Sequence, residues 1–145
     1  MRMPHTVMFV DDDNEDVEIF CEAIGLIDNR IQRIICANGK EAINLLSNSD
    51  SVVPDFIFLD INMPVMNGME CFVALKKIDK LKHVPVIMCS TSKYIGDQLA
   101  CEKLGADFYL VKPNTLIKVI NAFQHIFSAY QTKKLKVHKE GKMVA

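Results

Sequence analysis

The chain has 145 residues, half of them hydrophobic, so it is long enough to form one domain with a full apolar core. Its formal net charge of −1 gives no overall preference for nucleic acid or for a membrane surface. Residues 131–145 hold five Lys and one Glu, a net +4, so residues 1–130 carry a net −5. We expect an acidic domain over residues 1–130 and a basic, disordered C-terminal tail over residues 131–145.

Short apolar segments alternate with helical patterns along the domain. A strand is expected at Thr6–Val10, followed by a helix at Asn14–Ile27, where apolar residues recur at i, i+3, i+4 and i+7. Further strands are expected at 31–36, 56–59, 84–89 and 108–111, and further helices at 39–46, 69–78, 94–104 and from 116 onward. This alternation predicts an α/β fold, with a parallel sheet that is covered by helices on both faces.

The cysteines and the N-terminus indicate the compartment. Five cysteines are scattered through apolar segments, without a C-x-x-C motif or a zinc-like spacing, as is typical of core side chains in a reducing environment. The apolar run Val7–Val10 is too short for a signal peptide and stops at three aspartates. No apolar stretch is long enough to cross a bilayer. We therefore expect a cytoplasmic protein.

Polar side chains follow four of the five expected strands. In chain order they are Asp11, Asp12 and Asp13, then Asp60, then Ser90 and Thr91, and finally Lys112. The carboxyl ends of parallel strands meet at one rim, where ligands bind in sheets of this kind. Several carboxylates at one rim repel each other unless a cation neutralises them, and such oxygen ligands suit Mg²⁺. A metal, a lysine and a hydroxyl around Asp60 suit phosphoryl transfer, with Asp60 as the nucleophile.

Each of these residues also has an ordinary structural explanation. Asp11–Asp13 can cap the following helix, Ser90 can bond to its own loop, and Lys112 can be a solvated surface lysine. An EF-hand calcium loop is excluded, because Asp16 stands where the sharp turn needs Gly and a strand precedes where a helix should. The order and strand context of the whole set favour the phosphoryl site.

Four segments carry a resemblance to a known family: VDDD (10–13), LDINMPVMNG (59–68), PVIMCST (85–91) and GADFYLVKP (105–113). In order, spacing and strand context they resemble the response-regulator receiver domain of two-component signalling. The resemblance implies a flavodoxin-like, doubly wound fold with five parallel strands in the order 2-1-3-4-5. It further implies a stand-alone receiver of the CheY-like type, a phosphoprotein that is not an enzyme.

The resemblance implies a phosphorylation site and a metal site. Asp60 resembles the phosphoacceptor, which becomes an aspartyl phosphate. Asp11 and Asp12 resemble the acidic pair that holds Mg²⁺ together with Asp60, Asp12 directly and Asp11 through water. The backbone carbonyl of Asn62 is implied as a further metal ligand.

The resemblance also implies a switch. Ser90 resembles the hydroxyl that moves to bond the phosphoryl oxygen, and Tyr109 resembles the aromatic residue that turns inward on activation. Lys112 is implied to pair with the phosphoryl group, with a cis bond between Lys112 and Pro113. Two positions depart from the family pattern: Thr91 is larger than usual beside the switch hydroxyl, and Ser92 is too short to align a water. These two positions predict slow self-dephosphorylation.

The implied function is a phosphorelay. The protein is expected to accept a phosphoryl group from a histidine kinase or a histidine phosphotransfer protein. It would then bind an unidentified downstream protein through its fourth helix, fifth strand and fifth helix, with no nucleic-acid or membrane partner. A Mg²⁺-dependent phosphohydrolase is a second hypothesis, disfavoured because Asn62 stands where many such enzymes have Asp. A constitutive binding module is a third, disfavoured by the complete set of site residues.

Overall fold

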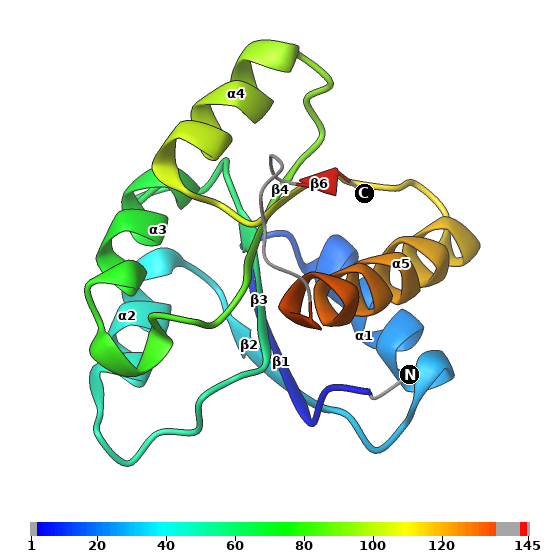
Figure 1. Ribbon diagram of the computed structural model, residues 1–145, viewed down its shortest axis with the longest axis horizontal. Helices are drawn as coiled ribbons and strands as arrows, with labels where there is room; N and C mark the ends of the chain where they lie inside the picture. Colours follow the sequence, from blue (N-terminus) through cyan, green and yellow to red (C-terminus); the bar gives the residue numbers. More distant parts are fainter. Residues whose placement is uncertain (1–2, 136–142, 145) are drawn as a thin grey trace.

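The computed structural model of the chain describes residues 3–135 and 143–144. The five expected strands are present, as β1 (Thr6–Val10), β2 (Gln32–Cys36), β3 (Phe56–Asp60), β4 (Val86–Ser90) and β5 (Phe108–Val111). The connecting helices are α1 (Asn14–Ile27), α2 (Gly39–Ser47), α3 (Gly68–Lys76), α4 (Ile95–Leu104) and α5 (Leu116–Leu135), with a 3-10 turn, η1 (Asp79–Leu81), before β4. The strands are parallel and lie in the order β2-β1-β3-β4-β5, which confirms the predicted flavodoxin-like fold (Figure 1).

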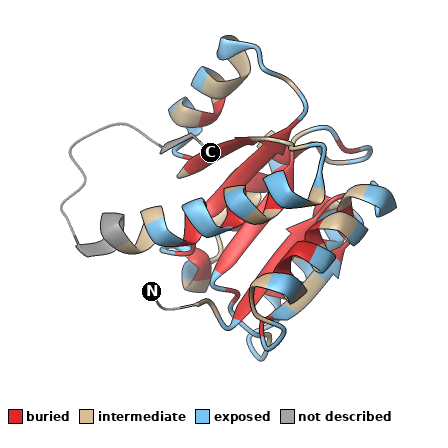
Figure 2. Cartoon of the chain, turned by 90° about the vertical axis from the view of Figure 1, so that its right-hand side faces the viewer, coloured by how far each residue is buried: buried red, intermediate tan, exposed pale blue. Residues whose placement is uncertain are grey.

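The sheet lies between two layers of helices. Helices α1 and α5 cover one face, and α2, α3 and α4 cover the other (Figure 1). Every residue of β1, β3 and β4 is buried, as expected for parallel strands that are covered on both faces. The edge strand β2 has only one buried residue, Cys36. Figure 2 shows the buried strands between helices whose outer surfaces are exposed.

The two faces of the sheet bury different kinds of side chain. Along β1, Val7 and Phe9 point to the α1–α5 face, whereas Met8 and Val10 point to the α2–α4 face, as the alternation of a strand requires. Seven phenylalanines pack on the α1–α5 face: Phe9, Phe20, Phe56, Phe58, Phe108, Phe123 and Phe127. The α2–α4 face is packed mainly by Leu, Ile, Val, Met and Cys, with Phe72 and Tyr109 as its buried aromatic residues.

The structure describes part of residues 131–145, the range that was expected to be a disordered tail. Helix α5 continues to Leu135, past the expected domain boundary at residue 130. A short strand, β6 (Met143–Val144), pairs in parallel with the edge of β5, with Phe108 opposite Met143 and Tyr109 opposite Val144. The rest of the expected tail, residues 136–142 and 145, lies outside the described residues.

Candidate functional site

Three charged residues meet where β1, β3 and β5 end. Asp11 follows β1, and its backbone N–H donates to Cys36 O at 3.0 Å, so it is held beside β2. Asp60 is the last residue of β3. Lys112 follows β5, and its backbone N–H donates to Ser90 O at 2.8 Å. Asp11 and Asp60 are buried, with 4% and 6% of their surface exposed, so the rim brings two carboxylates and one ammonium group out of water together.

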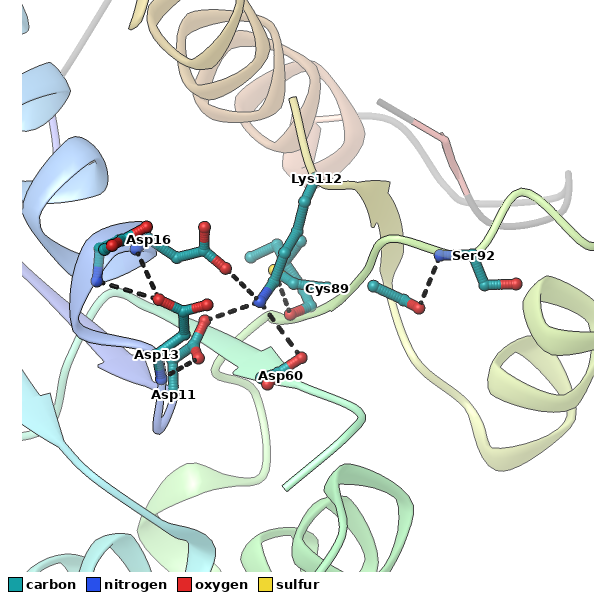
Figure 3. Close-up of polar contacts among 10 residues, drawn as sticks. Asp11, Asp13, Asp16, Asp60, Cys89, Ser92 and Lys112 are labelled. Carbon is teal, nitrogen blue, oxygen red and sulfur yellow. Dashed lines mark hydrogen bonds and ion pairs between the residues drawn. The ribbon is translucent and has the colours of Figure 1, made fainter. Parts of the chain in front are cut away.

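The Lys112 ammonium group is shared among three carboxylates (Figure 3). Its Nζ lies 2.8 Å from Asp16 Oδ2, 2.9 Å from Asp11 Oδ2 and 3.4 Å from Asp60 Oδ1. Sequence reasoning placed Lys112 beside Asp60 but missed Asp16, which it considered only as part of an EF-hand loop. The available signal was weak, because an acidic residue in the first turn of a helix is common for reasons of the helix dipole alone.

The three consecutive aspartates have different tasks. Asp13 is the N-cap of α1, and its Oδ1 accepts hydrogen bonds from the backbone N–H groups of Glu15 and Asp16 at 2.9 and 3.2 Å. The capping explanation therefore holds for Asp13. The Asp13 backbone N–H in turn donates to Asp11 Oδ1 at 2.9 Å, which orients the Asp11 carboxylate toward the rim. Asp12 is exposed and lines an open cleft, which Asp60 also lines.

Asp11, Asp12 and Asp60 form a candidate metal site. Each offers one carboxylate oxygen, and these three oxygens lie within 4.8 Å of one another. Carboxylate oxygens that converge in this way suit a hard divalent cation, because they would otherwise repel one another. The exposed position of Asp12 leaves the site open to the cleft, which Asn62 and Thr91 also line. The residues present therefore fit the metal that the sequence predicted.

The charges of the site shift two pKa values. Burial, and then the negative charge of Asp11, raise the pKa of Asp60 to about 6, although Lys112 and a hydrogen bond from the Asn62 backbone N–H act in the opposite direction. Burial alone would lower the pKa of Lys112, but the bonds and charges of Asp16, Asp11 and Asp60 outweigh it and raise the pKa above its usual value. Lys112 therefore stays charged, whereas the surroundings of Asp60 make the negative charge of its carboxylate less favourable.

The loop between β3 and α3 holds the end of β3 in place. The Gly68 backbone N–H donates to Ile61 O at 2.8 Å, and a Cβ on Gly68 would lie only 2.3 Å from Asp60 O, so the chain needs Gly there. Within the loop, Met66 N donates to Pro64 O at 2.7 Å across Val65, whose φ of 68° lies in the left-handed region. A β-branched residue rarely adopts this conformation, so the turn is strained.

The predicted switch residues lie on the other side of Asp60. Ser90 is buried at the end of β4, and its Oγ accepts a hydrogen bond from the Ser92 backbone N–H at 3.0 Å. Ser92 O accepts from the Tyr109 hydroxyl at 2.9 Å, and Ser92 Oγ donates to Asp97 in the first turn of α4. Ser92 thus connects the end of β4 to both β5 and α4, and Figure 3 shows it turned away from Asp60.

One detail differs from the sequence-based expectations, and another bears on the predicted switch. Tyr109, which was expected to turn inward on activation, lies inward in this structure, with 3% of the residue exposed and its hydroxyl donating to Ser92 O. The Lys112–Pro113 bond was expected to be cis, yet the described part of the chain contains no cis peptide bond. The trans isomer is the more stable one for X–Pro by about 0.5–1 kcal/mol, and Lys112 reaches Asp11 and Asp60 with this bond trans.

A doubly wound parallel sheet with an acidic triad at its C-terminal rim and a lysine after its fifth strand defines a receiver domain. The family model of the response regulator receiver domain matches residues 7–124, and the chain belongs to this family. The acidic triad is of the type that holds a metal in receivers, and the family is not one of enzymes. None of the helices described within residues 3–135 is both long and apolar enough to cross a bilayer.

Curated relatives and solved structures agree with this membership. The polar-differentiation response regulator DivK of Brucella anthropi is 30% identical over 122 residues, which cover 84% of this chain and 95% of DivK. The transcriptional regulatory protein PrrA of Mycobacterium leprae is 36% identical over 79% of this chain, which spans only about half (46%) of PrrA. The Mn²⁺-bound response regulator Rcp1 superposes with a TM-score of 0.75 at 27% identity, over 90% of this chain and 96% of Rcp1.

Proposed function

We propose that this response regulator accepts a phosphoryl group on Asp60 from a histidine kinase, or from a histidine phosphotransfer protein, and passes the signal to a downstream protein. Membership of the receiver family implies a cognate histidine kinase. The observation that carries the proposal is the position of Asp60. Its carboxylate is buried at the end of a rigid strand, 3.4 Å from Lys112 and beside the acidic pair.

The transfer itself is a substitution at phosphorus. An Asp60 carboxylate oxygen forms the new P–O bond while the P–N bond of a phosphohistidine breaks, and the imidazole nitrogen keeps the electron pair. A divalent cation, for which we propose Mg²⁺, would neutralise the charge that gathers on the phosphoryl oxygens. Lys112 contributes a second positive charge, and its raised pKa supports the view that it stays protonated throughout.

The protein residues for the metal are Asp11, Asp12 and Asp60, with the backbone carbonyl of Asn62 as a further ligand. Asp12 is exposed to the cleft and can bind the ion directly. Asp11 is already engaged by Lys112 and by the Asp13 backbone N–H, which supports a contact through water. Thr91 lines the same cleft, as expected if it restricts the approach of small phosphodonors.

The signal would leave through α4, β5 and α5. The Ser90 hydroxyl oxygen accepts a bond from Ser92 N, so its proton is available to a phosphoryl oxygen on Asp60. Any movement of Ser90 acts on the backbone of Ser92. Ser92 in turn contacts two elements: its carbonyl oxygen accepts a hydrogen bond from the Tyr109 hydroxyl, and its side-chain hydroxyl donates to Asp97. Because Tyr109 is already inward, we propose that phosphorylation stabilises a conformation that exists before it, which gives some basal partner binding.

We further propose that the protein acts in the cytoplasm and binds proteins rather than nucleic acid or membranes. Each of its five cysteines is a free thiol, which fits a reducing compartment. The near-zero net charge offers no broad attraction to a polyanion.

The test is incubation with acetyl phosphate and Mg²⁺, followed by intact-mass analysis. The wild-type protein should gain one phosphoryl group, and Asp60→Asn should gain none. Asp55→Asn is the matched control, because Asp55 lies at the opposite end of the same strand and accepts hydrogen bonds from the His5 and Thr6 backbones. A stoichiometric adduct on Asp60→Asn, or none on wild type and Asp55→Asn, would contradict the proposal.

A further inference from the structure

Lys112 is held most closely by a residue that the proposed chemistry does not use. A lysine ammonium group has three N–H donors, and the acceptors around Nζ are Asp16 at 2.8 Å, Asp11 at 2.9 Å and Asp60 at 3.4 Å. The two shorter contacts are charge-assisted hydrogen bonds, which are roughly twice as strong as neutral ones. In this structure the lysine is therefore bound mainly to the α1 side of the site, and its interaction with Asp60 is the weakest of the three.

Capping does not explain where the Asp16 carboxylate lies. Asp16 is the third residue of α1, and its backbone N–H is already satisfied by Asp13 Oδ1. An acid in this turn gains from the helix dipole wherever its side chain points. Glu15, in the same turn, is exposed. Asp16 instead reaches Lys112, 96 residues away in sequence, and its side chain is 32% exposed (Figure 3).

The position of Asp16 has an electrostatic cost that its bond to Lys112 can offset. It adds a fourth carboxylate near Asp11, Asp12 and Asp60, which already repel one another. The same carboxylate must compete for Lys112 with the oxygens of any phosphoryl group placed on Asp60. The free energy of the Lys112–Asp16 bond in the unmodified protein therefore opposes the transfer of the lysine to a phosphoryl group.

We propose that Asp16 is a positioning residue that holds Lys112 on the α1 side of the site and thereby sets how readily the lysine is released to a phosphoryl group on Asp60. This inference rests on the proposed function. Asp16 touches neither the phosphoryl group nor Asp60, and it acts only through Lys112. Its removal makes the phosphorylated form easier to reach, because less binding free energy is lost when Lys112 moves.

Beryllium fluoride with Mg²⁺ is a suitable probe, because it forms a tetrahedral, phosphoryl-like anion on a carboxylate and its binding is an equilibrium. We expect Asp16→Asn to bind it roughly fivefold more tightly than wild type by ¹⁹F NMR titration, since one charge-assisted bond no longer competes. Asp16→Ala, which has no acceptor at all, should show at least the same gain. Equal or weaker binding in both variants would overturn the inference.

The matched control is Glu15→Gln. Glu15 lies in the same turn and lines the same cleft, but it forms no ion pair with Lys112 among the described residues. The Glu15→Gln variant removes the same charge as Asp16→Asn. If the direct bond of Asp16 matters, the affinity of Glu15→Gln for beryllium fluoride should differ less than twofold from that of wild type. An equal gain in affinity in Glu15→Gln would show that the effect comes from net charge alone, and it would overturn the positioning role of Asp16.

A second readout follows the lysine itself. In ¹⁵N-labelled protein the Lys112 NH₃⁺ protons should exchange with water slowly, because the side chain is 8% exposed and its donors are engaged. Asp16→Asn should speed this exchange severalfold, and Glu15→Gln should leave it unchanged. If wild type takes up neither beryllium fluoride nor a phosphoryl group, the proposed function fails. If wild type binds the probe and exchange in Asp16→Asn is unchanged, only the role of Asp16 fails.

Discussion

The two faces of the sheet differ in how firmly they hold their helices. On the α1–α5 face, Phe123 of α5 packs against Phe9, Phe20, Phe58 and Phe127, with ring centroids 4.7–6.3 Å apart. On the opposite face, α4 is described in full, and Cys101 is the only one of its ten residues that is buried. Interlocked aromatic rings fix a helix in one position, whereas a helix with one small buried side chain is weakly restrained.

This contrast indicates which part of the molecule can respond to phosphorylation. Ile95 and Leu99 of α4 keep 58% and 50% of their surface exposed, so little apolar area would be lost if the helix moved. The face that is packed by methionine, leucine and cysteine also contains Tyr109, and its side chains adapt more easily than phenylalanine rings do. Rigidity on one face and a weakly held helix on the other allow a local change without loss of the fold.

The largest expected effect comes from a change in the aromatic core of the α1–α5 face. Phe123→Ala should lower the free energy of unfolding by about 3–5 kcal/mol, because it opens a cavity among four rings. Cys101→Ala, the corresponding change in α4, should cost only about 1 kcal/mol. Urea denaturation followed by circular dichroism measures both. Similar losses in the two variants would show that α4 is held as firmly as α5.

The next effect concerns the acidic site at the carboxyl rim of the sheet. In the presence of a chelator, Asp60→Asn should raise the free energy of unfolding by about 1–2 kcal/mol at pH 7.5, after allowance for solvent screening. Because the folded-state pKa of Asp60 is raised to about 6, wild type loses stability as the pH rises through this value. The gain in Asp60→Asn should therefore shrink between pH 7 and pH 4.

Thermal melts over this pH range measure the difference. Asp55→Asn serves as the control, since its carboxylate accepts two backbone hydrogen bonds and its replacement relieves no such repulsion. A stabilisation by Asp60→Asn that is independent of pH would mean that the charge of Asp60 is not its cause.

The smallest expected effect concerns the hydrogen bond between Tyr109 and Ser92, beside the weakly held helix α4. Tyr109→Phe removes the hydroxyl that donates to Ser92 O, a loss of about 0.5–1.5 kcal/mol. Amide hydrogen exchange should become faster in residues 92–104 and stay unchanged in the buried part of α5. Faster exchange throughout the domain would instead indicate that Tyr109 supports the whole core rather than the attachment of α4.

The sequence predicted the features that depend on pattern. Continuous apolar runs predicted β1, β3 and β4. The rule that parallel strands share one carboxyl rim predicted that Asp11, Asp60 and Lys112 lie together, as they do. The roles of Asn62 as a metal ligand and of Ser90 as a switch stay predictions.

The features that were missed depend on side-chain direction and on competition between local states. No pattern shows which acid in the first turn of α1 turns toward Lys112, so Asp16 was overlooked. The inward position of Tyr109 depends on whether an acceptor lies within reach, and this is set by the conformation of the loop after β4. Helix α5 ends at Leu135, and a disordered segment beyond it stays a prediction.

The bond between Lys112 and Asp11 joins residues that are 101 positions apart. It closes a loop almost as long as the domain, and closing such a loop is entropically costly until the intervening strands have paired. During synthesis Asp11 and Asp60 leave the ribosome long before Lys112, so until β5 is added their carboxylates lack the ammonium group that offsets their repulsion. The charge balance of the site is therefore completed only after the segment that carries Lys112 has been added and folded against β1 and β3.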